Sequence, residues 1–326
     1  MNVKLCNYGL VIKNNDLKAM LNGAYFNLLK KLTIKTPQKV GPDKVARSYK
    51  FYNLDGVKYI CLPRTLLTNL FDLNNIVLDN KLSQNVNLID VDFIGELFPN
   101  QTIICNWLCD NIFNNQNGTA TAGCVLDLMA GLGKTFVAAG IISRLKLRTL
   151  YIVPRTHLKI QAYEDLLPIL DSCNVGLFDK NDENKYDVSL IVINSALKLS
   201  DDVFNKYSLV IFDEIHMYCG QVFRDIFFKA QTKYVLGMTA TSHHRLDKFD
   251  SLYYKLIGNV VEAKNIPGYD DNTDHFVGQV KAIHYLGHDA FVKTFYNEKT
   301  GKPNTQKTIE QFIDDDSRNK LIIRET

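Results

Sequence analysis

The hydrophobic positions change character near residue 93. From there on, short apolar runs alternate with stretches in which apolar residues recur three and four positions apart. Runs of four or more apolar residues, each followed by a polar turn, begin at residues 124, 149, 189, 209 and 234. Continuous apolar strands separated by helices predict an α/β domain whose parallel sheet is covered on both faces. Functional groups are then expected at the carboxyl ends of the strands.

The first 92 residues predict a smaller, mixed α+β accessory domain. Residues 17–32 have helical spacing, and residues 49–61 alternate around Asp55-Gly56, which is a strong hairpin signal. We expect the aromatic side chains of this hairpin to belong to a core rather than to an RNA-stacking sheet, although several of the tyrosines could face outward. The parallel-sheet domain is then predicted over residues 93–258. A connecting segment follows over residues 259–326, with one strand near 276–287 and a helical tail.

Composition limits the class of protein. The chain has 326 residues, of which 46% are hydrophobic, and this is enough for two or three domains with cores. The formal net charge is only +3, so nucleic acid would have to bind local basic groups. Seven scattered cysteines without a CxxC pair predict buried thiols in a reducing compartment. The sequence begins without a secretory signal and lacks a membrane-length apolar run, so we expect a cytoplasmic protein with no membrane contact.

The stretch LDLMAGLGKTFVAAGII, residues 126–142, predicts a phosphate-binding loop. Its turn follows a strand and opens a helix, as such a loop requires. Glycines let backbone N–H groups surround a phosphate, Lys134 can neutralise the β- and γ-phosphates of ATP, and Thr135 can hold Mg²⁺. A bare GKT tripeptide is often a surface turn, and Leu128 replaces the first glycine of the usual pattern. The predicted ATP-binding residues of the turn are Gly131, Leu132, Gly133, Lys134 and Thr135.

A second polar group follows the strand at residues 209–212. Asp213 and Glu214 supply one carboxylate to hold Mg²⁺ and another to orient the attacking water. Alternatively, two acids at this place would merely cap the next helix. The combination of this pair with the lysine turn on another strand favours a nucleoside triphosphatase.

These segments resemble the motifs of superfamily 2 helicases and translocases. GLGKT is similar to motif I, DEIH to the DExH form of motif II, and GMTATS to motif III, although TATS replaces the usual TATP. The resemblance implies a RecA-like fold for the parallel-sheet domain and places His216 with the catalytic residues. It also implies that His216 and motif III couple the γ-phosphate state to the grip on nucleic acid. The motif III residues are Thr239, Ala240 and Thr241.

Further segments resemble the family's ligand-contacting motifs. FIGELFPNQ is similar to the adenine-recognising segment, which makes Gln101 the candidate partner of the adenine ring. IVPRTHLKIQ resembles motif Ia and INSALKL the next backbone-contact motif. The resemblance implies that they carry these residues toward a DNA or RNA backbone: Arg155, Thr156, Gln161, Asn194 and Ser195. Basic residues beside motif Ia are expected to add to this surface: Arg144, Lys146, Arg148, Arg155 and Lys159.

Within the superfamily, the stretch from DEIH onward is similar to the XPB-like branch, although Arg245-Leu246-Asp247 lacks the middle acid of that branch's Arg-Glu-Asp element. LLKKLTIKTP, YICLPR, GQVKAIHYLGH and DDDSRNKLII resemble the transcript-release helicases of poxviruses and other large cytoplasmic DNA viruses. That likeness implies a viral protein acting in transcription elongation or transcript release, with RNA polymerase as a possible partner.

Motors of this superfamily close two RecA-like lobes over ATP, and the second lobe supplies arginine fingers. One lobe is visible in this sequence, so we expect the isolated chain to bind ATP and Mg²⁺ but to hydrolyse ATP slowly without a second lobe. Two other functions stay open: a non-catalytic ATP- and nucleic-acid-binding subunit of a transcription complex, and a double-strand DNA translocase of the Swi/Snf type. His243-His244, which could suggest a metal site, has no acid or thiol partner at ligand spacing and predicts a loop.

Overall fold

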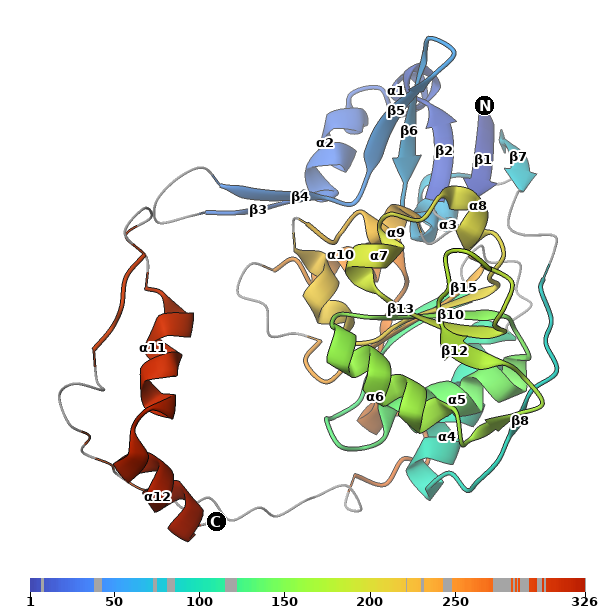
Figure 1. The fold of residues 1–326 in the computed structure, drawn as a ribbon. Helices are drawn as coiled ribbons and strands as arrows, with labels where there is room; N and C mark the ends of the chain where they lie inside the picture. Colours follow the sequence, from blue (N-terminus) through green and yellow to red (C-terminus); the bar gives the residue numbers. More distant parts are fainter. Residues whose placement is uncertain are drawn as a thin grey trace. The chain divides into compact units, whose positions relative to one another are not determined.

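The structure is a computed structural model that divides into two compact units, Met1–Asp274 and His275–Thr326. Figure 1 shows the order of the elements along the chain. The residues that the structure describes are 1–6, 9–37, 43–72, 75–80, 86–114, 122–220, 222–229, 232–242, 248–271, 283, 285, 287, 293–297, 301 and 303–325.

A seven-stranded parallel sheet forms the centre of the first unit. Its strand order is β12-β13-β10-β14-β15-β9-β16, and the five predicted apolar runs all lie in it. This order confirms the predicted α/β fold with a RecA-like sheet. The strands are β9 (Ala122–Asp127), β10 (Thr149–Val153), β12 (Val175–Leu177), β13 (Val188–Val192), β14 (Leu209–Phe212), β15 (Tyr234–Thr239) and β16 (Val260–Glu262).

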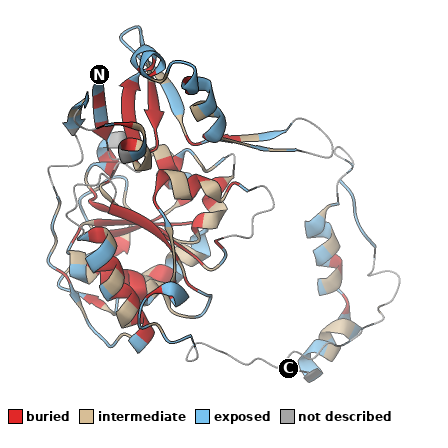
Figure 2. Ribbon diagram, turned by 180° about the vertical axis from the view of Figure 1, so that it is seen from behind, coloured by how far each residue is buried: buried red, intermediate tan, exposed pale blue. Residues whose placement is uncertain are grey.

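Both faces of this sheet are buried, as the continuous apolar runs predicted. Along β10, Leu150 and Ile152 belong to one core, whereas Tyr151 and Val153 belong to the other. Figure 1 shows α4, α5 and α6 on one side of the sheet and α7, α9 and α10 on the other, and Figure 2 shows the buried strands between them. The helices are α4 (Pro99–Leu108), α5 (Lys134–Leu145), α6 (Thr156–Leu166), α7 (Ile193–Ala196), α8 (Asp201–Phe204), α9 (Ile226–Lys229) and α10 (Ser251–Leu256).

Short elements complete the lobe. A π-helical turn over Cys109–Phe113 continues α4. A 3₁₀ turn over Ile215–Cys219 follows β14, and a second one over Ala263–Asn265 follows β16. The small ribbon β8 (Asp92–Phe93) and β11 (Leu170–Asp171) pairs antiparallel.

The N-terminal domain is built on a five-stranded sheet of order β5-β6-β2-β1-β7. Its strands are β1 (Asn2–Cys6), β2 (Gly9–Lys13), β5 (Lys50–Leu54), β6 (Val57–Leu62) and β7 (Val77–Asn80), beside the separate ribbon β3 (Thr33–Thr36) and β4 (Lys44–Arg47). Its helices are α1 (Asn14–Leu21), α2 (Ala24–Lys31), a 3₁₀ turn (Arg64–Leu66) and α3 (Leu67–Leu70).

Two predictions for this domain have different outcomes. The hairpin at Asp55-Gly56 is confirmed, because both residues have the positive φ angles, 49° and 75°, that suit a tight hairpin turn. The helical spacing over residues 17–32 is confirmed, but the stretch forms two short helices. Asn22 takes a positive φ of 46° and ends α1, and α2 begins two residues later.

The aromatic side chains of the hairpin are core residues in part, because Tyr49, Tyr52 and Tyr59 are partly buried and pack against core clusters. Phe51 is 36% exposed and Tyr52 is half-buried. Tyr52 stacks on Tyr59 across the two strands with ring centroids 5.5 Å apart. Phe51 is paired with Ile60 on one face of the sheet, whereas Tyr52 and Tyr59 lie on the other face against the small cluster of Cys6, Val11 and Cys61.

A buried arginine joins the N-terminal domain to the lobe. Arg64 is 2% exposed, and its Nη1 donates to the carbonyl oxygens of Thr232 and Lys233 at 3.1 and 3.3 Å. Beside it, Thr65 Oγ1 donates to Lys255 O at 2.7 Å. Since β15 begins at Tyr234, the arginine contacts the lobe at the amino end of that strand, opposite the ends where functional groups are expected.

The end of the lobe differs from the expected boundary at residue 258, because β16 pairs with β9 and extends the sheet to Glu262. The strand expected near 276–287 lies almost entirely outside the described residues. The predicted helical tail is confirmed in the second unit, as α11 (Thr305–Ile313) and α12 (Asp316–Glu325). The seven cysteines are in the reduced state, and six of them are buried. No helix in the described ranges is both long and apolar enough to cross a membrane.

Candidate nucleotide-binding site

The turn between β9 and α5 has the backbone of a phosphate-binding loop. Gly131 and Gly133 take φ angles of 84° and 76°, which glycine adopts without steric cost. Helix α5 begins at Lys134 and runs for 12 residues, so its free N–H groups and its dipole point at the turn. All five predicted residues, from Gly131 to Thr135, lie in this turn or in the first helical turn. The local geometry therefore suits an anion such as a triphosphate.

The acidic pair lies beside this turn. Strand β14, which precedes Asp213, is separated from β9 by β15 alone. Lys134 Nζ lies 3.6 Å from Glu214 Oε1, and the two side chains are 12% and 27% exposed. Lys134, which follows the turn after β9, and Glu214, which follows β14, thus lie next to each other, as a metal–triphosphate site requires.

Hydrogen bonds continue from the acidic pair to the third predicted motif. His216 Nδ1 lies 3.3 Å from Glu214 Oε2 and 2.9 Å from Thr239 Oγ1. Thr239 Oγ1 in turn accepts the backbone N–H of Thr241 at 3.1 Å. A connected series of polar groups, which we call the relay, therefore links Lys134, Glu214, His216, Thr239 and Thr241. Ala240, between the two threonines, follows the end of β15.

The two acids have opposite electrostatic environments. Burial, together with the neighbouring Glu214 carboxylate, raises the pKa of Asp213 to about 6. The hydrogen bond with His216 is the main reason why the pKa of Glu214 is lowered, and Lys134 adds to this effect. Glu214 is thus held ionised, whereas the Asp213 carboxylate gains most from a nearby cation.

The donor set suits Mg²⁺. Carboxylate and hydroxyl oxygens are the hard ligands that Mg²⁺ prefers, and it commonly takes one or two carboxylates together with substrate phosphates. Asp213 and Thr135 supply such oxygens, and one Asp213 oxygen also accepts the N–H of Glu214 at 3.0 Å. Within the described ranges, no cluster of three or more histidine, cysteine or acidic residues could hold a metal without a substrate.

Gln101 lies beside the phosphate-binding turn with its amide already engaged. It is 6% exposed, its Oε1 accepts Phe98 N at 3.0 Å, and its Nε2 donates to Leu132 O at 3.1 Å. These contacts fix the start of α4 to the turn. An adenine ring would have to compete with both partners, and the predicted adenine contact stays a prediction.

The residues predicted to contact a nucleic-acid backbone share one edge of the sheet. Strands β10 and β13 pair in parallel up to Val153 and Val192. Arg155 and Thr156 follow the first strand, Asn194 and Ser195 follow the second, and Gln161 lies further along α6. All five are exposed.

The basic group expected beside motif Ia is divided between the two ends of β10. Arg155 and Lys159 lie at its carboxyl end, whereas Arg148 precedes the strand. There Arg148 donates to the carbonyl oxygens of Glu183 and Tyr186 at 2.9 and 3.1 Å. Lys146 pairs with Asp90 and Asp92. The prediction of one continuous basic surface is therefore wrong. Strand β10 separates the two groups, so residues 144–148 lie at its amino end and residues 155–159 at its carboxyl end.

Two functional candidates lie outside the predicted set. Ser242, which occupies the last position of TATS, is buried, and its hydroxyl donates to the carboxylate of Asp127 at the end of β9. This hydrogen bond joins motif III to β9, the strand that leads into the phosphate-binding turn. In the sequence, the only feature that pointed to Ser242 was the serine in place of the proline of TATP. Tyr151 is fully buried in β10, where burial and the Asp213 carboxylate raise the pKa of its phenol. His243-His244 and Arg245-Leu246-Asp247 lie outside the described residues.

Comparisons with known proteins agree with this geometry. Residues 94–244 match the family model described as "Type III restriction enzyme, res subunit". The chain is 29% identical over 338 residues to a protein of African swine fever virus named "Putative ATP-dependent RNA helicase". That match covers 98% of this chain and 61% of the viral protein. A mimivirus protein of the same name is 24% identical over 239 residues, covering 72% of this chain and 44% of the relative.

Other matches extend to archaea and phages. The "DNA 3'-5' translocase XPB2" of Sulfurisphaera tokodaii is 32% identical over 142 residues, covering 44% of this chain and 32% of that protein. The solved structure of the UvsW helicase from bacteriophage T4 superposes with a TM-score of 0.52 at 13% identity. It covers 80% of this chain and 100% of that chain, and supports the fold. Residues 94–244 thus match this family model and are similar to proteins that are named as helicases and translocases. The chain spans about three fifths of the African swine fever virus protein.

Proposed function

We propose that this chain carries the ATP-hydrolysing lobe of a nucleic-acid helicase or translocase. The observation that supports this proposal most directly is the relay from Lys134 through Glu214 and His216 to Thr239. It joins a triphosphate-binding lysine to the strand end that precedes motif III. A site built only to hold ATP would not need a polar connection from the acid to a third strand.

Each side chain has a defined task in this mechanism. Lys134 binds the β- and γ-phosphates of ATP, and the N–H groups of the turn surround them. Glu214, held ionised, accepts a hydrogen bond from water and orients it toward the γ-phosphorus. Asp213 and Thr135 would hold Mg²⁺, which neutralises phosphate charge when it is bound.

Loss of the γ-phosphate frees the partners of Glu214 and changes its hydrogen bond with His216. The change reaches Thr239 and then the N–H of Thr241, beyond the end of β15. We propose that this movement alters how the carboxyl edge holds a DNA or RNA backbone through Arg155, Thr156, Gln161, Asn194 and Ser195. The adenine of ATP would lie near Gln101.

The biological setting is proposed from the relatives. Two viral relatives carry names that describe an RNA helicase. Together with the transcript-release resemblance, this supports a viral, cytoplasmic role in transcription elongation or transcript release, with RNA polymerase as partner. A second RecA-like lobe, in the same or another chain, would supply the arginine side chains that stabilise the transition state.

Two substitutions test the proposal. Lys134→Ala removes the phosphate partner and should abolish binding of a fluorescent ATP analogue. Glu214→Gln keeps the shape and should preserve ATP binding while hydrolysis falls about a hundredfold or more. Lys146→Ala, an exposed lysine just beyond the last turn of the same helix, is the matched control and should change neither quantity. Full hydrolysis by Glu214→Gln, or stimulation by neither DNA nor RNA in the parent protein, would contradict the proposal.

A further inference from the structure

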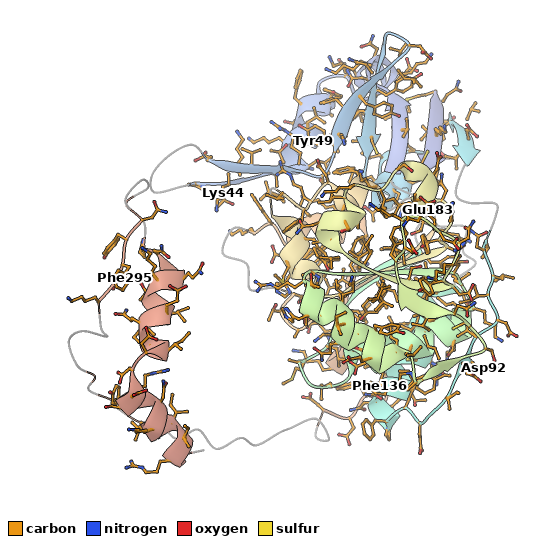
Figure 3. All side chains as sticks on the ribbon, viewed as in Figure 1. Lys44, Tyr49, Asp92, Phe136, Glu183 and Phe295 are labelled. Atoms are coloured by element: carbon orange, nitrogen blue, oxygen red, sulfur yellow. The ribbon has the colours of Figure 1, made fainter. Side chains whose placement is uncertain are left out.

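A pocket of about 420 Å³ lies where the N-terminal domain meets α9 of the lobe, away from the nucleotide site. One wall is the link from β4 to β5, which carries Tyr49, and the start of β5. The other wall comes from residues 224–228. Figure 3 labels Lys44, where β4 begins, and Tyr49, where the link leads into β5. No residue of the relay lines this pocket.

Aromatic rings supply the apolar part of the lining. Phe51 is 36% exposed, and its ring meets that of Tyr49 edge-on with centroids 5.5 Å apart. Lys58 Nζ lies 4.5 Å from the centroid of the Phe51 ring. Phe228 completes the lining from α9. An exposed ring that is braced by a second ring and flanked by a cation is suited to stack against a flat, polarisable group.

Cations supply the polar part. Arg47, Lys50 and Arg224 line the pocket, with Asp225 as the single acid. The guanidinium of Arg224 is anchored because its Nη1 donates to Val45 O at 2.7 Å. The surrounding segment is strongly basic, since residues 30–58 contain eight lysines and arginines but two aspartates. The whole chain, by comparison, has a net charge of only +3.

We propose that this pocket binds one nucleotide of a single-stranded nucleic acid. The base stacks on Phe51, and Arg47, Lys50 and Arg224 contact the flanking phosphates. Base–aromatic stacking combined with a positive groove is the usual means of holding single strands without sequence preference, and the volume suits a base with its sugar. Exposed lysines extend beyond the pocket along the ribbon and the hairpin, at Lys35, Lys44 and Lys58, so a strand can continue past it.

This site goes beyond the proposed motor function, because it requires neither ATP nor the residues of the carboxyl edge. Arg155 and its neighbours follow strands β10 and β13, whereas the pocket lies at the junction with the N-terminal domain. Two separate contacts would let the N-terminal domain keep hold of a strand while the carboxyl edge releases it.

The test measures fluorescence anisotropy of labelled 20-nucleotide dT and U strands and of a duplex, without ATP and over a series of salt concentrations. Arg47→Ala combined with Lys50→Ala should weaken single-strand binding about tenfold or more and reduce the salt slope by about 1.4, which corresponds to two lost phosphate contacts. Lys4→Ala combined with Lys13→Ala removes two exposed lysines of the same domain, outside both the pocket and the basic segment, and should stay within about twofold of the parent.

The ring is tested separately. Phe51→Ala should weaken binding by about fivefold to a hundredfold, whereas Phe51→Trp should restore it and show fluorescence quenching when a strand binds. ATP-analogue binding by every variant should equal that of the parent, which separates this proposal from the motor function. Equal affinity of the pocket and control variants, tighter binding of the duplex, or displacement of the strand by stoichiometric UMP or AMP would each overturn the proposal.

Discussion

Asp213→Asn should make the protein more stable while it removes the response to Mg²⁺ and ATP. The carboxylate of Asp213 has a cost in the free protein, because burial and Glu214 raise its pKa from 3.8 to about 6. At about 1.4 kcal/mol for each pKa unit, this difference corresponds to about 3 kcal/mol of lost stability at pH 7. Asparagine has the same shape, carries no charge, and can still accept the N–H of Glu214.

The sign of the pH dependence follows from proton binding. Between about pH 4 and pH 6 the folded protein holds a proton on Asp213 that the unfolded chain has released, so stability falls as the pH rises through this window. The advantage of Asp213→Asn should therefore be about 3 kcal/mol at pH 7 and about 1.6 kcal/mol at pH 5.

Urea unfolding followed by the fluorescence of Trp107, the only tryptophan of the chain, measures this difference in the lobe itself. ATP with Mg²⁺ should raise the unfolding midpoint of the parent but not that of Asp213→Asn. Asp110→Asn, at an exposed position of the same lobe, should stay within about 0.5 kcal/mol of the parent. A variant that is no more stable at pH 7, or whose advantage grows toward pH 5, would refute the reasoning.

Three further substitutions probe the relay, the domain contact and the phosphate-binding turn. Thr239→Val removes the hydroxyl that contacts His216. The stimulation of the ATPase rate by nucleic acid should therefore fall about tenfold, while the affinity for ATP stays the same. Unchanged stimulation would exclude the relay as the coupling route. Arg64→Ala removes two hydrogen bonds of a buried cation and should lower the free energy of unfolding in urea by about 3 kcal/mol, and a loss below about 1 kcal/mol would contradict this. Gly133→Ala puts an alanine at a φ of 76° and places its methyl group against Gln101. Titration with a fluorescent ATP analogue should then show at least about tenfold weaker binding. Binding with the affinity of the parent would contradict this expectation.

The central sheet was predictable because each core strand is a continuous apolar run that ends in a polar turn. The strands β12 and β16 were missed, since each has three residues and gives too short a run to recognise. The break after α1 was missed for a local reason, because the apolar spacing continues through Asn22-Gly23 while the backbone does not.

Within the site, the residues of the turn and the acidic pair could be found from sequence, because their chemistry depends on neighbours along the chain. The engagement of Gln101 and the bond between Ser242 and Asp127 could not. Ser242 and Asp127 lie 115 positions apart in the sequence, and they meet only because β15 and β9 are neighbours in the sheet. Hydrogen bonds of this kind depend on strand order, which hydrophobic patterning does not specify.

Arg64 holds the accessory domain against the end of the sheet that takes no part in the chemistry. Burial keeps this guanidinium away from water and lowers its pKa to about 10. Separation of the two domains would cost free energy, because the two carbonyl oxygens would lose their hydrogen-bond donor. A force that a bound nucleic-acid strand exerts on the N-terminal domain would therefore be transmitted through this fixed contact to the amino end of β15.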